Sequence, residues 1–126
     1  MLINEYFQEI RHLIEACPII QSYNLIIDSR SLYVGFIRGD LNLVDGTLLH
    51  IREFVNVKTG IERGKYTYQY MSASNDLVFR YDNAPHHQEL NLPNYPHHKH
   101  IGSEENIISS NAPSLADVLK EIEENR

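Results

Sequence analysis

The sequence predicts an α+β fold in which an N-terminal and a C-terminal helix flank a curved antiparallel sheet. Apolar residues recur at helical spacing near both ends of the chain. Short segments with alternating polar and apolar side chains fill the middle, and their connections are too short for crossover helices. We therefore expect a single domain over residues 1–126, with five to six strands in a meander.

The first helix is expected over about residues 4–17. Asn4 is its expected N-cap, and Pro18 ends it. The apolar residues that share one face of this helix are Tyr6, Phe7, Ile10, Leu13, Ile14 and Cys17. Such a helix must bury its apolar face, so we expect it to pack on one face of the sheet.

The C-terminal helix is expected over about residues 114–124. Ser114 can cap it, and Asp117 occupies the capping-box position three residues later. Its apolar stripe consists of Leu115, Val118, Leu119 and Ile122.

The strands are expected between about residues 19 and 101. The Asp45-Gly46 pair indicates a tight hairpin between two of them. Residues 83–96 are expected to form a long irregular loop, and residues 97–101 a short strand at the edge of the sheet.

The overall composition indicates a folded cytoplasmic protein. The 126 residues are 42% hydrophobic, and 11 basic against 17 acidic side chains give a formal charge of −6. This balance argues against a general nucleic-acid coat, whose affinity comes from Lys and Arg on phosphates. No apolar run approaches the ~20 residues of a membrane span, the N-terminus does not resemble a signal peptide, and the lone Cys17 fits a reducing cytosol.

The charge is uneven along the chain. Residues 1–49 carry three basic and six acidic side chains (−3), and residues 101–126 carry two and six (−4). Residues 50–100 carry six basic and five acidic side chains (+1) and hold six of the seven histidines. Protonation of those histidines near their ordinary pKa of about 6.5 would make this middle segment positive.

Glu53 is unusual because it shares a predicted strand face with apolar side chains. A carboxylate on an apolar face is costly or becomes neutral with a raised pKa, so Glu53 could be a poised general acid or base. The alternative is that a twist or bulge turns Glu53 toward water, or that Glu53 pairs with an arginine.

A group of polar residues lies where a predicted strand ends in the long loop. Arg80 and Asp82 share one face of this strand. Arg80 could hold a phosphate with its planar guanidinium. Alternatively, Arg80 forms a surface ion pair and Asp82 caps the turn that Pro85 fixes.

Five histidines fall within fifteen residues, and this concentration is the main functional signal in the sequence: His86, His87, His97, His98 and His100. On a strand, His98 and His100 would share one face while His97 and Lys99 take the other.

Two chemistries are open for these histidines. The imidazoles could perform acid–base catalysis on a phosphodiester, with Lys99 and Arg80 stabilising the anion. Alternatively, several of the histidines and a carboxylate could bind zinc or another divalent metal. The candidate metal ligands are His86, His87, His98 and His100.

Three tyrosines alternate along another predicted strand and therefore share one face. Packing against the core is the favoured explanation, because aromatic side chains pack well across strands. The functional alternative is that they stack on the bases of single-stranded RNA. The three are Tyr66, Tyr68 and Tyr70.

Three runs of the sequence stand out together: Tyr66-Thr-Tyr68-Gln-Tyr70, the run LVFRYDNAPHH from Leu77 to His87, and Pro96-His97-His98-Lys99-His100. They resemble the TumE-type toxins of type II toxin–antitoxin systems, and the likeness covers the whole chain. The resemblance implies a small toxin that is neutralised by a partner encoded beside it, usually a helix-turn-helix antitoxin.

The resemblance also implies RNA as the substrate class, and by analogy with small ribonucleases we expect a metal-independent endoribonuclease without a cofactor. Glu53 or His86 would take the 2′-OH proton, and His98 or His100 would protonate the leaving oxygen. The expected catalytic residues are Glu53, Arg80, Asp82, His86, His98 and His100. The expected substrate-binding residues are Tyr68, His87, His97 and Lys99.

Two other functions are open. One is a metal-dependent hydrolase or nuclease that uses the histidines to hold zinc or another divalent metal. The other is a non-catalytic protein-binding module that docks a partner through the tyrosine face or the acidic C-terminal helix. A homodimer is compatible with all three functions, and no membrane partner is expected.

Overall fold

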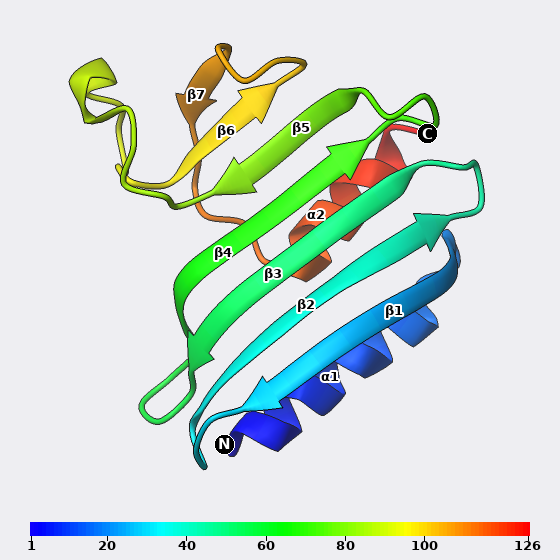
Figure 1. The fold of residues 1–126 in the computed structure, drawn as a ribbon, viewed down its shortest axis with the longest axis vertical. Coiled ribbons are helices and arrows are strands. Elements are labelled where there is room, and N and C mark those ends of the chain that lie inside the picture. The colour runs from blue at the N-terminus through cyan, green and yellow to red at the C-terminus, as the bar shows by residue number, and fades with distance from the viewer.

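A computed structural model describes residues 1–126 and contains two helices, a short 3₁₀ helix and one seven-stranded sheet (Figure 1). Each strand pairs antiparallel with the next strand along the chain, so the order in the sheet is the order in the sequence. The elements are α1 (Ile3–Ala16), β1 (Ile20–Ser29), β2 (Val34–Leu43), β3 (Leu48–Asn56), β4 (Glu62–Met71), β5 (Leu77–Asp82), η1 (Gln88–Leu90), β6 (His98–Ile101), β7 (Ile107–Ser109) and α2 (Leu115–Glu124).

The α+β class, the meander and both helices are confirmed, but the sheet has seven strands rather than five to six. The additional strand, β7, pairs with β6, so residues 98–101 do not form the edge of the sheet. β7 has only three residues, which is too short to give a detectable alternation in the sequence.

The two helices begin differently. Ser114 caps α2 as expected, because its Oγ accepts from the Asp117 amide while the Asp117 carboxylate accepts from the Ser114 amide. The expectation that Asn4 caps α1 is wrong, since Leu2 occupies that position and Glu5 accepts from its backbone N–H at 2.7 Å. The Asn4 side chain instead accepts a hydrogen bond from Ser29.

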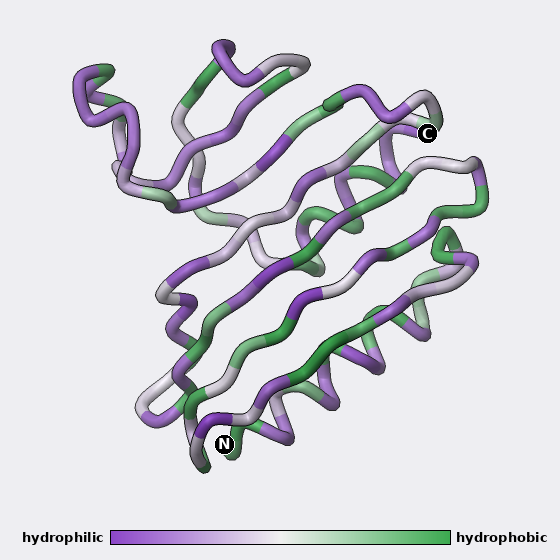
Figure 2. Tube along the Cα trace, viewed as in Figure 1, coloured by the Kyte–Doolittle hydropathy of each residue, from purple (hydrophilic) through white to green (hydrophobic).

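The sheet has one covered and one open face. Both helices lie behind the sheet in Figure 1, with α1 along β1 and β2 and α2 behind the middle strands. Purple and green segments alternate along the central strands in Figure 2, because apolar side chains point to the helices and polar ones point away. The core therefore lies between the sheet and the two helices.

Strand register arranges the polar side chains of the open face in two rows. The first row, from β2 to β6, is Arg38, Arg52, Thr67, Asp82 and His98. The second row is Asp40, His50, Gln69, Arg80 and His100. Neighbouring strands are about 4.8 Å apart, so adjacent side chains within a row are close enough to interact.

The packing of α1 on β2 leads to a first prediction. A Cβ on Gly35 would lie 2.8 Å from two ring carbons of Phe7 and 2.9 Å from Ile3 Cγ1. Gly35→Ala must therefore displace α1, and we expect a loss of about 1–3 kcal/mol in the free energy of unfolding, measured in urea.

Gly64→Ala is the matched control, because a Cβ there would meet nothing closer than 3.7 Å. We expect this variant to change the free energy of unfolding by less than about 1 kcal/mol. Equal stability of the two variants would contradict the close packing of α1 on β2.

Candidate active site

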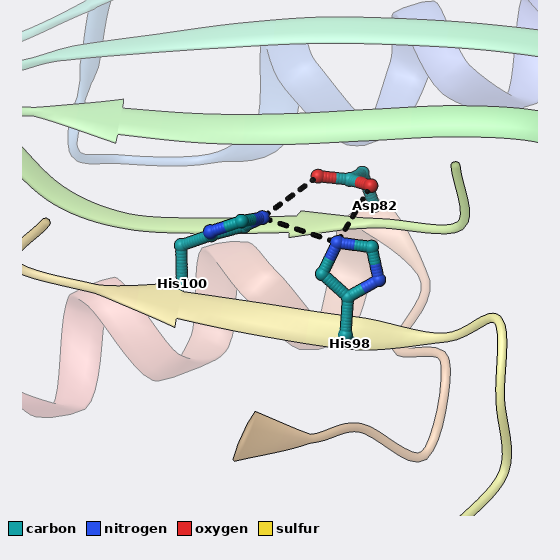
Figure 3. Close-up of side chains that lie close together, drawn as sticks. All are labelled: Asp82, His98 and His100. Atoms are coloured by element: carbon teal, nitrogen blue, oxygen red, sulfur yellow. Dashed lines mark hydrogen bonds and ion pairs between the residues drawn. The ribbon is translucent and has the colours of Figure 1, made fainter. Parts of the chain in front are cut away.

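Asp82, His98 and His100, which we call the Asp–His–His cluster, bring their polar atoms together between β5 and β6 (Figure 3). The Nε2 of His98 lies 3.0 Å from Asp82 Oδ1 and 3.1 Å from the Nε2 of His100. The Nε2 of His100 lies 3.6 Å from Asp82 Oδ2. The three residues are only 6%, 4% and 2% exposed, in the order named.

Hydrogen bonds on the far side of each ring determine what the facing nitrogens can do. The Nδ1 of His98 donates to the carbonyl oxygen of Pro96 at 2.7 Å, and that of His100 donates to the carbonyl oxygen of Glu104 at 2.8 Å. A carbonyl oxygen can only accept, so both Nδ1 atoms carry a proton and the Nε2 of each neutral ring is an acceptor. Burial lowers the pKa of His100, which keeps its ring neutral at neutral pH.

Three acceptors therefore converge in the cluster, and they repel one another unless a positive charge lies between them. A proton on His98 would supply that charge, and so would a metal cation. Zinc ligands lie about 2.0–2.2 Å from the ion, which in a tetrahedral site places neighbouring ligand atoms about 3.3–3.6 Å apart. The three separations here, 3.0, 3.1 and 3.6 Å, are close to that spacing. Two imidazoles and a carboxylate suit zinc or non-haem iron, and the Nδ1–carbonyl bonds are those of metal-binding histidines.

Arg80 and Glu104 flank the cluster. Arg80 Nε donates to Asp82 Oδ2 at 3.0 Å, and its two terminal nitrogens donate to the Glu104 carboxylate at 2.6 and 2.5 Å. These hydrogen bonds raise the pKa of Arg80 and lower that of Glu104. Two carboxylates and one guanidinium leave a net charge of −1 when the histidines are neutral, which favours a bound cation. Because Arg80 is engaged in this way, it is not free to hold a substrate phosphate.

The two histidines of the β5–β6 loop differ in their position. The ring centre of His87 lies 5.9 Å from those of both His98 and His100. Its side chain is 36% exposed, so it stands between the buried cluster and solvent. His86 is exposed and contacts His87 at 6.2 Å between ring centres, outside the cluster.

A polar groove of about 470 Å³ lies beside the cluster on the open face. It is lined by residues of both rows, among them Arg38, Asp40, His50, Arg52 and Gln69. Asp40 Oδ1 lies 2.5 Å from the Nδ1 of His50. None of the four charged or imidazole side chains was among the expected site residues. The alternation that places Glu53 on the apolar face also places His50 and Arg52 on the opposite face, and this is the signal that could have identified them.

Glu53 is not near the cluster, because it projects from the covered face of β3 into the core and is 2% exposed. The hydroxyl groups of Tyr6 and Tyr68 donate to its two carboxylate oxygens, the second at 2.6 Å. Arg63 donates to the Tyr68 hydroxyl at 3.0 Å. Glu53 and His98 therefore do not share a cleft, and the expected pairing of the two as base and acid is not compatible with this geometry.

Of the four expected substrate-binding residues, only His87 lies beside the cluster, and the other three lie away from the open face. Tyr68 is completely buried beside Glu53. Lys99 projects toward α2, where Nζ lies 3.0 Å from Glu121 Oε2, and the Nδ1 of His97 lies 2.8 Å from the Tyr66 hydroxyl. The alternation along β6 is thus as expected, but it separates Lys99 and His97 from the cluster.

A model of the family described as "Toxin TumE" matches residues 10–126, nearly the whole chain. The chain belongs to the TumE toxin family. No curated protein and no solved structure matches it. Family membership makes it a toxin of a toxin–antitoxin system, and its partner is accordingly an antitoxin.

No helix of the toxin is long and apolar enough to cross a membrane. The longest helix, α1, has 14 residues, and its polar side chains alternate with the apolar ones that pack on the sheet.

The Glu53 network leads to a second prediction. Burial, and then the neighbouring Glu53 carboxylate, raise the pKa of Tyr68, so its hydroxyl keeps its proton and serves as a donor. Tyr68→Phe removes a hydrogen-bond donor from the buried Glu53 carboxylate and an acceptor from Arg63. We expect the free energy of unfolding in urea to fall by about 1–3 kcal/mol, while toxicity per folded molecule is unchanged.

Tyr70→Phe is the control on the same face of β4, because the Tyr70 hydroxyl donates only to the partly buried Thr47 hydroxyl at 3.0 Å. Its loss of stability should be smaller. If Tyr68→Phe stays as stable as the wild type but no longer arrests growth, the purely structural role of this network is wrong.

Proposed function

We propose that this toxin is a metal-dependent endoribonuclease and that the Asp–His–His cluster holds its divalent ion. The observation that supports this proposal is the convergence of three buried acceptor atoms, which requires a positive charge between them. A metal-independent reaction needs an acid and a base in one cleft, and neither expected base lies in the cluster: Glu53 is on the other face of the sheet, and His86 is exposed outside the cluster.

An ion in this position would polarise a phosphoryl oxygen and lower the pKa of a bound water. In the hydrolysis, the water oxygen forms a bond to phosphorus, the bond from phosphorus to the leaving ribose oxygen breaks, and a proton from the water ends on that oxygen. His87 is in a suitable place to carry this proton, because its ring is next to the cluster and more exposed than the other two.

Arg80 is a positioning residue in this proposal. Its Nε bonds to Asp82 Oδ2 and its terminal nitrogens bond to Glu104, so it links the cluster carboxylate to the β6–β7 connection. A hydrogen bond to a ligating carboxylate orients it, and loss of such a bond typically costs 10- to 100-fold in metal affinity or activity.

The antitoxin is proposed to be a helix-turn-helix protein, as the family resemblance implies. DNA-binding surfaces are basic, and the exposed side of α2 offers acidic side chains to such a partner. They are Asp117, which also caps the helix, Glu123, and Glu124, which lies 3.9 Å from Lys120. The homodimer compatible with the sequence stays a prediction.

Metal content and RNA cleavage test the proposed function. We expect untagged toxin to hold about one divalent ion per chain by elemental analysis, and His98→Ala and His100→Ala to lose it. RNA cleavage should fall by about 100-fold or more in both variants and in wild-type toxin treated with EDTA.

His86→Ala is the matched control, because this histidine belongs to the same sequence cluster but lies outside the ligand set. It should keep both the ion and the activity. Metal-free wild-type toxin that cleaves RNA at its full rate would overturn the proposal in favour of metal-independent catalysis. If the toxin binds the ion but cleaves no RNA, the proposed nuclease function is wrong and the cluster is a structural metal site.

A further inference from the structure

Arg38 and Arg52 form an unusual pair on the open face. They are directly opposite each other on β2 and β3, both are exposed, and neither takes part in an ion pair. Like charges directly opposite each other on neighbouring strands destabilise a sheet. An anion between the two guanidinium groups would remove this repulsion, and the planar fork of arginine matches the oxygens of a phosphate.

The surroundings of this pair leave its positive charge available. The groove lining holds two guanidinium groups against one carboxylate, that of Asp40, which is hydrogen-bonded to the Nδ1 of His50. The remaining polar groups of the groove are neutral hydrogen-bonding side chains, including Asn24, Thr67 and Gln69. Amide and hydroxyl groups of this kind can bond base edges and ribose hydroxyls as well as phosphates.

The groove ends next to the Asp–His–His cluster, because its lining residues Thr67 and Gln69 on β4 are directly opposite Asp82 and Arg80 on β5. Gln69 lines the groove, and its Oε1 accepts from an Arg80 terminal nitrogen at 3.4 Å. In the first row, the centre of the Arg38–Arg52 pair and the centre of the Asp82–His98 pair are three strand spacings apart, or about 14 Å. A short oligonucleotide can span this distance, so one RNA molecule could contact both the arginine pair and the Asp–His–His cluster.

The composition of the groove favours a nucleic acid over a protein segment. Only two of its ten lining residues are hydrophobic, whereas protein docking sites depend on apolar or aromatic anchors at their centre. We infer that this groove binds the phosphodiester backbone of single-stranded RNA through Arg38 and Arg52 and leads it to the cluster. The statement that the RNA runs toward the cluster rests on the proposed nuclease function. Binding of RNA to the groove can be measured without cleavage.

The test compares RNA binding by wild-type toxin and the double variant Arg38→Gln/Arg52→Gln in EDTA. The probe is a fluorescein-labelled single-stranded RNA of about 12 nucleotides, followed by fluorescence anisotropy over a range of salt concentrations. We expect the double variant to bind about 10-fold or more weakly, with a slope of log affinity against log salt that is shallower by about 1.4.

The control is Arg11→Gln/Lys120→Gln, which removes the same charge from the two helices on the covered side of the sheet. It should bind RNA as the wild type does, and circular dichroism should show all three proteins folded. Equal RNA affinity of the two double variants, or no binding by the wild type at low salt, would overturn the inference.

Binding of purified antitoxin tests whether the groove binds a protein instead of RNA. If Arg38→Gln/Arg52→Gln loses affinity for the antitoxin but not for RNA, the groove is a protein interface and the inference is wrong. The outcome is also separate from the proposed function. If RNA binding needs both arginines but the toxin holds no metal, the groove inference stands and the proposed metal-dependent mechanism is wrong.

Discussion

The arrangement of the proposed site depends on one electrostatic constraint, the meeting of three acceptor atoms in a buried place. His98 and His100 each donate Nδ1 to a backbone carbonyl, so both Nε2 atoms face the Asp82 carboxylate as acceptors. Strand pairing holds them there, because Asp82 on β5 is directly opposite His98 on β6. A proton on His98 or a divalent cation would supply the positive charge that these acceptors need, and our proposal is the cation.

The sheet separates two kinds of buried carboxylate. Glu53 on the covered face is satisfied by two tyrosine hydroxyls, and its environment is that of a structural group in the core. Asp82 on the open face instead lies among histidine acceptors and Arg80. Because side chains alternate between the faces of a strand, a core network and a polar face are built from neighbouring residues of the same strands.

Much of the fold follows from the sequence. Helical periodicity identified α1 and α2, Asp45-Gly46 identified a hairpin, and alternation correctly separated His98 and His100 from Lys99. The sequence does not reveal β7, because three residues are too few to show alternation. It does not reveal the cap of α1 either, because the Glu5 carboxylate, and not the side chain of an N-cap asparagine, accepts from the Leu2 amide.

The site was predicted only in part, because residue types do not say which strand faces meet. The histidine-rich runs indicate the cluster, and alternation places Glu53 on an apolar strand face. Only the strand register shows that Glu53 and the cluster lie on opposite faces of the sheet. The register likewise brings Arg38 opposite Arg52 across a hairpin, a pairing that the sequence alone does not reveal. The formal charge of −6 therefore conceals an open face with two unpaired arginines.

Anomalous X-ray diffraction at the zinc edge, from crystals of the toxin grown with zinc, shows whether the Asp–His–His cluster binds a metal ion. We expect an anomalous peak about 2 Å from three atoms, the Nε2 of His98, the Nε2 of His100 and an oxygen of Asp82. A cluster without any peak, with the two imidazoles joined by a hydrogen bond while zinc binds elsewhere in the same crystals, would contradict the proposed metal site.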